Sequence, residues 1–266
     1  MSKLLSKSYI GLVLTFLYAP IFVLILYSFN QSKSRGHWSG FSLRWYERLL
    51  HNDAILNAFV TTLLVAVIAS VAATVLGTAA AIGIHNMRKR SRTAVMNVTY
   101  LPVINPEIVM GVSLMLLFVL MGMKFGLLTL VLAHITFNLP YVILSVMPKL
   151  RQMDRYLFEA AMDLGCTPWQ AFRKVTLPEI MPGIVTGFLM AFTFSLDDFN
   201  ISYFVSGDKF QTLPILIYSM TRKRVSPEIN ALSAIIFVVV LLVLILVNIN
   251  DARREKELRK KEDALR

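Results

Sequence analysis

Charged residues are scarce in this sequence. Asp, Glu, Lys and Arg together make up 16% of the chain, whereas about a quarter of the residues in an ordinary soluble domain are charged. So few charged side chains cannot cover a water-exposed surface, which excludes an ordinary soluble globular protein. Hydrophobic residues instead make up 56%, and the mean hydropathy is +0.63. The composition is that of an integral membrane protein.

Several kinds of chemical site are also missing. The single cysteine, Cys166, excludes a disulfide within the chain, and we expect it to be an inert small residue. No G-x-x-x-x-G-K-[ST] sequence occurs, so the chain has no phosphate-cradling loop of that type. The four histidines lie far apart and form no Cys/His metal motif. We therefore expect no catalytic residues, no metal and no cofactor bound by this chain.

The hydrophobic residues are concentrated in six long runs. About 20 apolar residues span the hydrocarbon core of a bilayer, and the runs have about that length or more. They are residues 9–29, 57–85, 98–120, 125–147, 183–205 and 231–248. The first run exceeds a typical signal-peptide core and is followed by no small-x-small cleavage site, so we interpret it as an uncleaved span. The predicted fold class is all-α, a polytopic membrane protein with six transmembrane helices.

We expect no separate soluble domain. Residues 1–56 are interpreted as the N-terminal span with an outer loop, and residues 57–250 as the main transmembrane domain. The latter includes a long inner loop at about 149–182, and residues 251–266 form a charged tail. Eighteen of the Lys and Arg residues fall on the side of the two termini and nine on the other. The positive-inside rule therefore places both termini in the cytoplasm, and the net charge of +11 requires no nucleic-acid partner.

Three acidic residues lie inside the apolar runs. Asp197 and Asp198 are neighbours in the fifth run, and Glu107 follows Pro106 in the third. A carboxylate in hydrocarbon costs several kcal/mol, so such residues face protein or water. If the fifth run is one helix, Ser195 and Asp198 share a face, and no basic residue is assigned to any run.

We interpret Asp197, Asp198, Glu107 and Ser195 as parts of a transient cation-binding track. Adjacent carboxylates repel each other, and an arriving cation relieves that repulsion. The structural alternative is that an arginine of a partner subunit, or protonation with hydrogen bonding, satisfies each acid. Trp45 lies in the outer loop, where aromatic residues typically form a membrane-interface belt. We include Trp45 among the substrate-pathway candidates because it could instead touch a solute at the outer mouth.

The inner loop before the fifth run predicts two short helices. Asp154 can cap the first, and Gly165 can end it in the left-handed conformation. Thr167 can begin the second, with Pro168 at its first position and Gln170 three residues after the cap. The stretch LPEIMPG should then break the second helix before the fifth span.

The same loop matches a specific pattern. It resembles the E-A-A-x3-G-x9-I-x-L-P signature of binding-protein-dependent ABC importer permeases, with Val175 in place of the usual isoleucine. In that family the short helix docks into a groove of a cytoplasmic ATPase. The resemblance therefore implies an ATPase-coupling role for the matching residues. They are Glu159, Ala160, Ala161, Gly165, Leu177 and Pro178.

Other segments extend the resemblance almost from end to end. INPEIVMGVSLMLLF, HITFNLPYVI and SLDDFNISYFVSG are similar to segments of spermidine/putrescine importer permeases. The resemblance implies a polyamine substrate, a bacterial inner-membrane location, and ATP with Mg on a partner ATPase dimer. It also implies a homologous second permease subunit and a periplasmic polyamine-binding protein, with membrane lipid around the chain.

Other classes of function stay open at this point. The chain could be an ABC permease for another small solute. A proton- or sodium-coupled secondary transporter also uses intramembrane acids, although the cytoplasmic signature argues against that class. A purely structural membrane partner would not need acids without basic counterparts.

Overall fold

The computed structural model describes residues 3–32, 37–154, 156–223, 227–239, 241–242 and 245. Within this part the regular structure is helical, apart from an isolated bridge between Asn30 and Phe41. The all-α prediction is therefore confirmed. The chain divides into two compact units, one formed by Met1–Asp53 with Ser219–Arg266 and the other by Ala54–Tyr218.

Among the described residues, four helices are long and apolar enough to cross a membrane. They are α1 (Lys3–Ser28), α3 (Asp53–His85), α6 (Leu127–Gln152) and the continuous segment Pro168–Asp197. A fifth crossing is formed if α4 and α5 count as one bent span. The predicted span 231–248 lies only partly within the described residues, where Pro227–Val239 is a shorter apolar helix. The described residues therefore do not account for all six predicted spans. The predicted tail 251–266 lies outside the described residues.

The third apolar run is broken, and the expectation of one continuous span is wrong. α4 (Lys89–Ile104) and α5 (Glu107–Leu120) are bent by 105° at the break between them. Asn105 has the extended backbone typical of a residue before proline, and Pro106 has no N–H with which to continue the helix. The break therefore makes Glu107 the first residue of α5.

The entrance to the fifth run also differs from the prediction. α8 (Pro168–Ala171), the π-helical segment η1 (Phe172–Thr176) and α9 (Leu177–Asp197) follow one another without a break. The prediction that LPEIMPG interrupts this helix is wrong. The N–H of Leu177 bonds to the carbonyl five residues earlier. We attribute the continuity to this wider turn, which accommodates the ring of Pro178 in the first turn of α9.

A second break occurs inside the fifth run. α9 ends at Asp197, Asp198 has an extended backbone (φ −63°, ψ 118°), and α10 (Asn200–Val205) follows. The Asp198 carboxylate accepts the N–H groups of Ile201 and Ser202 at 3.2 and 2.7 Å. Because the first N–H groups of a helix have no partner inside it, Asp198 stabilises the start of α10.

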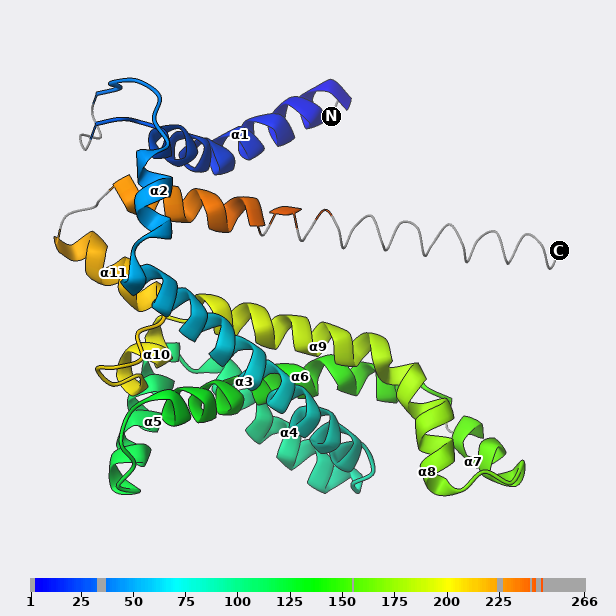
Figure 1. Cartoon of the computed structure of the whole chain (residues 1–266). Helices are drawn as coiled ribbons and strands as arrows, with labels where there is room; N and C mark the ends of the chain where they lie inside the picture. The colour runs from blue at the N-terminus through cyan, green and yellow to red at the C-terminus, as the bar shows by residue number, and fades with distance from the viewer. Residues whose placement is uncertain are drawn as a thin grey trace. The chain divides into compact units, whose positions relative to one another are not determined.

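α6 and α9 form the most extensive helix pair in the unit Ala54–Tyr218 (Figure 1). Two glycines of α9, four residues apart, allow the close approach. A Cβ added at Gly183 would lie 2.8 Å from the carbonyl oxygen of Ser145, and one at Gly187 would lie 3.2 Å from Cα of Val142. This small-xxx-small spacing is typical of tightly packed membrane helices.

Three short helices complete the description. α7 (Tyr156–Asp163) lies in the inner loop, near α8 and η1 (Figure 1). α2 (Arg44–Leu50) follows the first span, and α11 (Leu213–Lys223) includes the boundary between the two units.

Candidate functional site

The two helix breaks bring acidic groups from distant parts of the sequence together. Glu107 and Asn200 are the first residues of α5 and α10, which pack against each other. Asn200 Nδ2 donates a hydrogen bond to Glu107 Oε2 at 2.8 Å. The Glu107 carboxylate also lies close enough to Asp197 for the two charges to interact. Both carboxyl side chains are exposed, so they form one open acidic site.

The neighbouring aspartates have opposite surroundings. Asp197 is exposed at the carboxyl end of α9, where free backbone carbonyls concentrate negative partial charge. Asp198 is only 6% exposed. His134 Nε2 lies 3.5 Å from Asp198 Oδ2 and 3.0 Å from Ser202 Oγ. Asp198 therefore has partners inside the protein, whereas Asp197 faces outward.

The expectation that no basic residue lies near these acids is wrong for Asp198. His134 belongs to the fourth apolar run and is almost completely buried. A buried polar side chain needs a hydrogen-bonding partner. A histidine in one apolar run and an acid in another could therefore have predicted the contact between His134 and Asp198.

Ser195 is buried, with 3% of its surface exposed. It accepts a hydrogen bond from Asn138 Nδ2 on α6 at 2.7 Å. Because α9 ends before Asp198, the predicted common helical face of Ser195 and Asp198 does not form. Ser195 therefore links α9 to α6 and is buried in this structure.

Sequence reasoning missed aromatic side chains beside the open acids. Tyr141 of α6 and Phe194 of α9 have ring centroids 4.6 Å apart, and both are partly buried. Phe137 packs against the two rings. The Tyr141 hydroxyl lies close enough to Glu107 to interact with its charge. Tyr141, Phe194 and Phe137 therefore form an aromatic cluster between α6 and α9, with Phe194 three residues before Asp197 on α9.

Trp45, one of the candidates for contact with a solute, is buried in this structure. Its side chain is 1% exposed, and Nε1 donates to the carbonyl of Asn30 at 2.6 Å. The guanidinium groups of Arg44 and Arg48 lie 5.6 and 5.5 Å from the ring centroid. Burial under these contacts makes Trp45 an anchor for the segment around α2.

The inner loop has the capping geometry that the sequence predicts. Asp154 Oδ1 accepts the N–H of Tyr156 at 3.0 Å at the start of α7. Gly165 has φ +86°, and the next N–H bonds to the carbonyl of Ala161 at 3.1 Å, as in a Schellman C-cap. Thr167 and Gln170 form the predicted capping box.

The predicted coupling residues differ in exposure. Glu159, Ala160 and Gly165 are exposed, whereas Ala161 is buried. In the continuous helix, Leu177 is partly buried and Pro178 is exposed. Two large apolar side chains beside them are open to contact, Leu164 at 87% and Trp169 at 67%. The loop therefore presents an apolar surface that nothing in the described chain covers.

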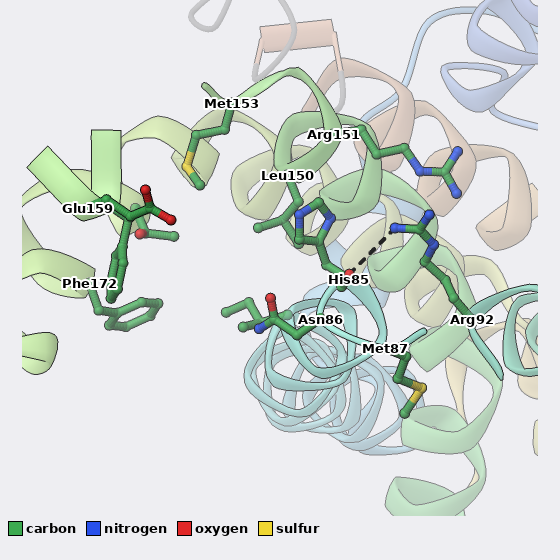
Figure 2. Close-up of a pocket in the computed structure, with 12 residues that line it drawn as sticks. His85, Asn86, Met87, Arg92, Leu150, Arg151, Met153, Glu159 and Phe172 are labelled. Carbon is green, nitrogen blue, oxygen red and sulfur yellow. Dashed lines mark hydrogen bonds between the residues drawn. The ribbon is translucent and has the colours of Figure 1, made fainter. Parts of the chain in front are cut away.

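A cavity of about 770 Å³ lies next to this loop. Figure 2 shows Glu159 and Phe172 on one side of it and His85 and Asn86 on another. Arg151 of α6 and Arg92 of α4 also line it. Among the described residues no cluster of His, Cys, Asp and Glu has the arrangement of a metal site.

Long apolar helices that are interrupted beside acidic residues are typical of a membrane transport subunit. The chain belongs to the family described as the binding-protein-dependent transport system inner membrane component, whose model matches residues 73–259. The resemblance seen in the inner loop is thereby confirmed. The protein is a membrane-spanning permease subunit of an ABC importer, not an enzyme.

Its relatives and structural neighbours are importer components. The spermidine/putrescine transport system permease protein PotC of Haemophilus influenzae is 39% identical over 91% of this chain and 94% of its own. The putrescine transport system permease protein PotI of Escherichia coli (strain K12) is 45% identical over 84% and 82%. A chain of a bacterial ABC transporter that imports the acidic polysaccharide alginate has the same fold. The two structures match with a TM-score of 0.72 at 17% sequence identity, and the match covers 94% of this chain and 95% of the alginate transporter chain.

Proposed function

We propose that this chain forms part of the translocation pathway of an ATP-driven importer for polyamines such as spermidine and putrescine. The observation that carries the proposal is the pair of exposed carboxylates at two helix breaks, Asp197 at the end of α9 and Glu107 at the start of α5, where Asn200 of α10 donates to Glu107 at 2.8 Å. The names of the relatives, PotC and PotI, point to the same substrates. An acidic site suits a solute with several ammonium groups and does not suit an anion such as alginate.

The surroundings of the two acids favour a cation that passes through. Asp197 lies at the negative end of α9, and half-helix carboxyl ends bind cations in other transporters. Tyr141 and Phe194 can add cation–π attraction, which is worth about 0.5–2 kcal/mol. Each contact is modest, so an ammonium group can be held and then released.

Asp198 and Ser195 act indirectly in this proposal. The carboxylate of Asp198 binds the first turn of α10, and Ser195 bonds to α6. Together they fix the end of α9 and the start of α10. They position Asp197 and Asn200 without touching the solute.

The remaining parts of the importer follow from the family. We infer that α7 and α8 dock onto a partner ATPase dimer, which binds ATP and Mg and supplies the driving force. Both termini then lie in the cytoplasm, and a periplasmic binding protein delivers the solute on the other side. A homologous second permease subunit completes the passage.

Replacing Gly165 should uncouple ATP hydrolysis from transport. Gly165→Leu forces a side chain into φ +86°, which costs roughly 1–2 kcal/mol, and crowds the docking surface. We expect fewer ATPase chains to co-purify, or ATP hydrolysis without uptake. Gly122→Leu is the matched control, because Gly122 has φ +68° and equally open surroundings. Equal uptake in the two variants would remove the loop from coupling.

Uptake by the intact complex tests the substrate class. In cells without other polyamine uptake, the complex should accumulate labelled spermidine or putrescine. ATP depletion should stop uptake, whereas collapse of the proton gradient alone should leave uptake unchanged. Excess unlabelled polyamine should compete, and methionine or alginate oligosaccharides should not. Uptake that follows the proton gradient, or no polyamine uptake by an assembled complex, would contradict the proposal.

A further inference from the structure

A second cleft, beside the cavity of Figure 2, is surrounded by basic side chains. It has a volume of about 410 Å³ and lies between α4 and the end of α6. Lys89 and Arg92 reach it from α4, and Arg151 reaches it from α6. Figure 2 shows the guanidinium groups of Arg92 and Arg151 together on the side of the cavity away from Glu159. None of the described residues that line this cleft is acidic.

The two arginines have no counter-ion in the described part of the chain. No carboxylate among these residues lies within ion-pairing distance of Arg92 or Arg151. Arg92 Nη1 donates to the carbonyl of His85 at 3.5 Å, which tethers that side chain. The rest of its guanidinium group can donate into the cleft. Like charges that meet around one cleft repel each other, so a bound anion would stabilise the arrangement.

Neutral hydrogen-bonding groups line the same cleft. Thr93, Asn97 and Tyr100 follow one another on one face of α4 at spacings of four and three residues. Met96, which is 6% exposed, forms an apolar floor. The arginine forks, the Asn97 amide and the Tyr100 hydroxyl can donate to the oxygens of a phosphate group, which has several acceptors in a compact space. The Thr93 hydroxyl already donates to the carbonyl of Lys89 at 2.9 Å.

The apolar side of α4 indicates where this phosphate comes from. Val98 and Leu101 are 64% and 56% exposed and lie on another face of the helix from the cleft. Basic residues at the start of a helix, followed by exposed apolar ones, are typical of a helix at a membrane surface. We propose that the cleft binds the phosphate headgroup of an anionic phospholipid, whose acyl chains lie along the apolar side of α4.

Lipid binding to the purified complex tests this site. Native mass spectrometry in detergent would measure how tightly the complex retains added phosphatidylglycerol. The double variant Arg92→Gln/Arg151→Gln should lower the affinity by at least roughly tenfold, because charge-assisted hydrogen bonds are lost. The control Arg88→Gln/Arg90→Gln removes two charges from the same segment outside the cleft. We expect it to change the affinity much less, and an equal loss in both variants would overturn the proposal.

Three further measurements separate the possible sources of phosphate and distinguish lost binding from a folding defect. Arg92→Lys/Arg151→Lys keeps the charges and should retain most of the binding. The unmodified complex should bind phosphatidylglycerol more tightly than zwitterionic phosphatidylcholine, and millimolar inorganic phosphate should not displace the lipid. Equal binding of the two lipids would show that no anionic-lipid site exists. Displacement by inorganic phosphate would assign the cleft to a free anion and overturn the lipid proposal. Polyamine uptake is not needed for any of these readouts.

Discussion

Removing the charge of Asp197 and Glu107 together is expected to lower polyamine uptake by roughly a hundredfold while the complex still assembles. Each substitution, Asp197→Asn and Glu107→Gln, keeps the size of the side chain and removes a carboxylate that can bind an ammonium group. A hydrogen bond to a charged group is worth about 1.5–3 kcal/mol, or roughly tenfold or more in affinity. The measurement is labelled-spermidine uptake divided by the amount of complex in the membrane.

The exposure of both acids makes this result separable from a folding defect. Neither side chain is buried, so amide replacements should leave the amount of complex and its basal ATP hydrolysis close to normal. Glu107→Gln also keeps an acceptor for Asn200, whose Nδ2 lies 2.8 Å away. Asp208→Asn is the matched control, because Asp208 is also exposed but lies beyond α10. Unchanged normalised uptake in the double variant would remove these acids from the pathway.

The sequence predicts the helical class and the local geometry of the inner loop well, because both depend on neighbouring residues. The membrane helices are predicted from the length of each apolar run. The caps at Asp154, Gly165 and Thr167 depend on residues within a few positions. The family signature falls in the same loop. These features need no knowledge of how distant helices pack.

The breaks in the third and fifth runs are harder to predict. A proline in a membrane helix can be accommodated, as Pro140 is inside α6, or can end the helix, as Pro106 does. Asp198 ends the regular run without a proline. Its break is stabilised by His134, which is 64 positions earlier and reaches it only in the folded bundle. The roles of two adjacent aspartates therefore depend on tertiary contacts.

Loss of the buried Asp198 carboxylate should deplete the complex more than it changes transport by the complex that remains. Asp198→Ala leaves the N–H groups of Ile201 and Ser202 and the ring of His134 without their buried partner. Each buried group that loses its hydrogen-bonding partner typically costs about 1–3 kcal/mol. Immunoblotting of membranes and thermal stability of the purified complex would measure the effect.

A graded series distinguishes this positioning role from direct contact with the solute. Asp198→Asn keeps a side-chain oxygen that can accept from Ser202 and should restore much of the complex, because asparagine caps helices well. His134→Gln should resemble it, since the amide can still donate toward Asp198. Asp208→Ala, at an exposed acid, should leave abundance unchanged. If Asp198→Asn instead gave normal abundance and stability with uptake as low as in Asp197→Asn, Asp198 would belong to the solute site. The assignment of Asp197 to the open site and of Asp198 to the protein interior would then be wrong.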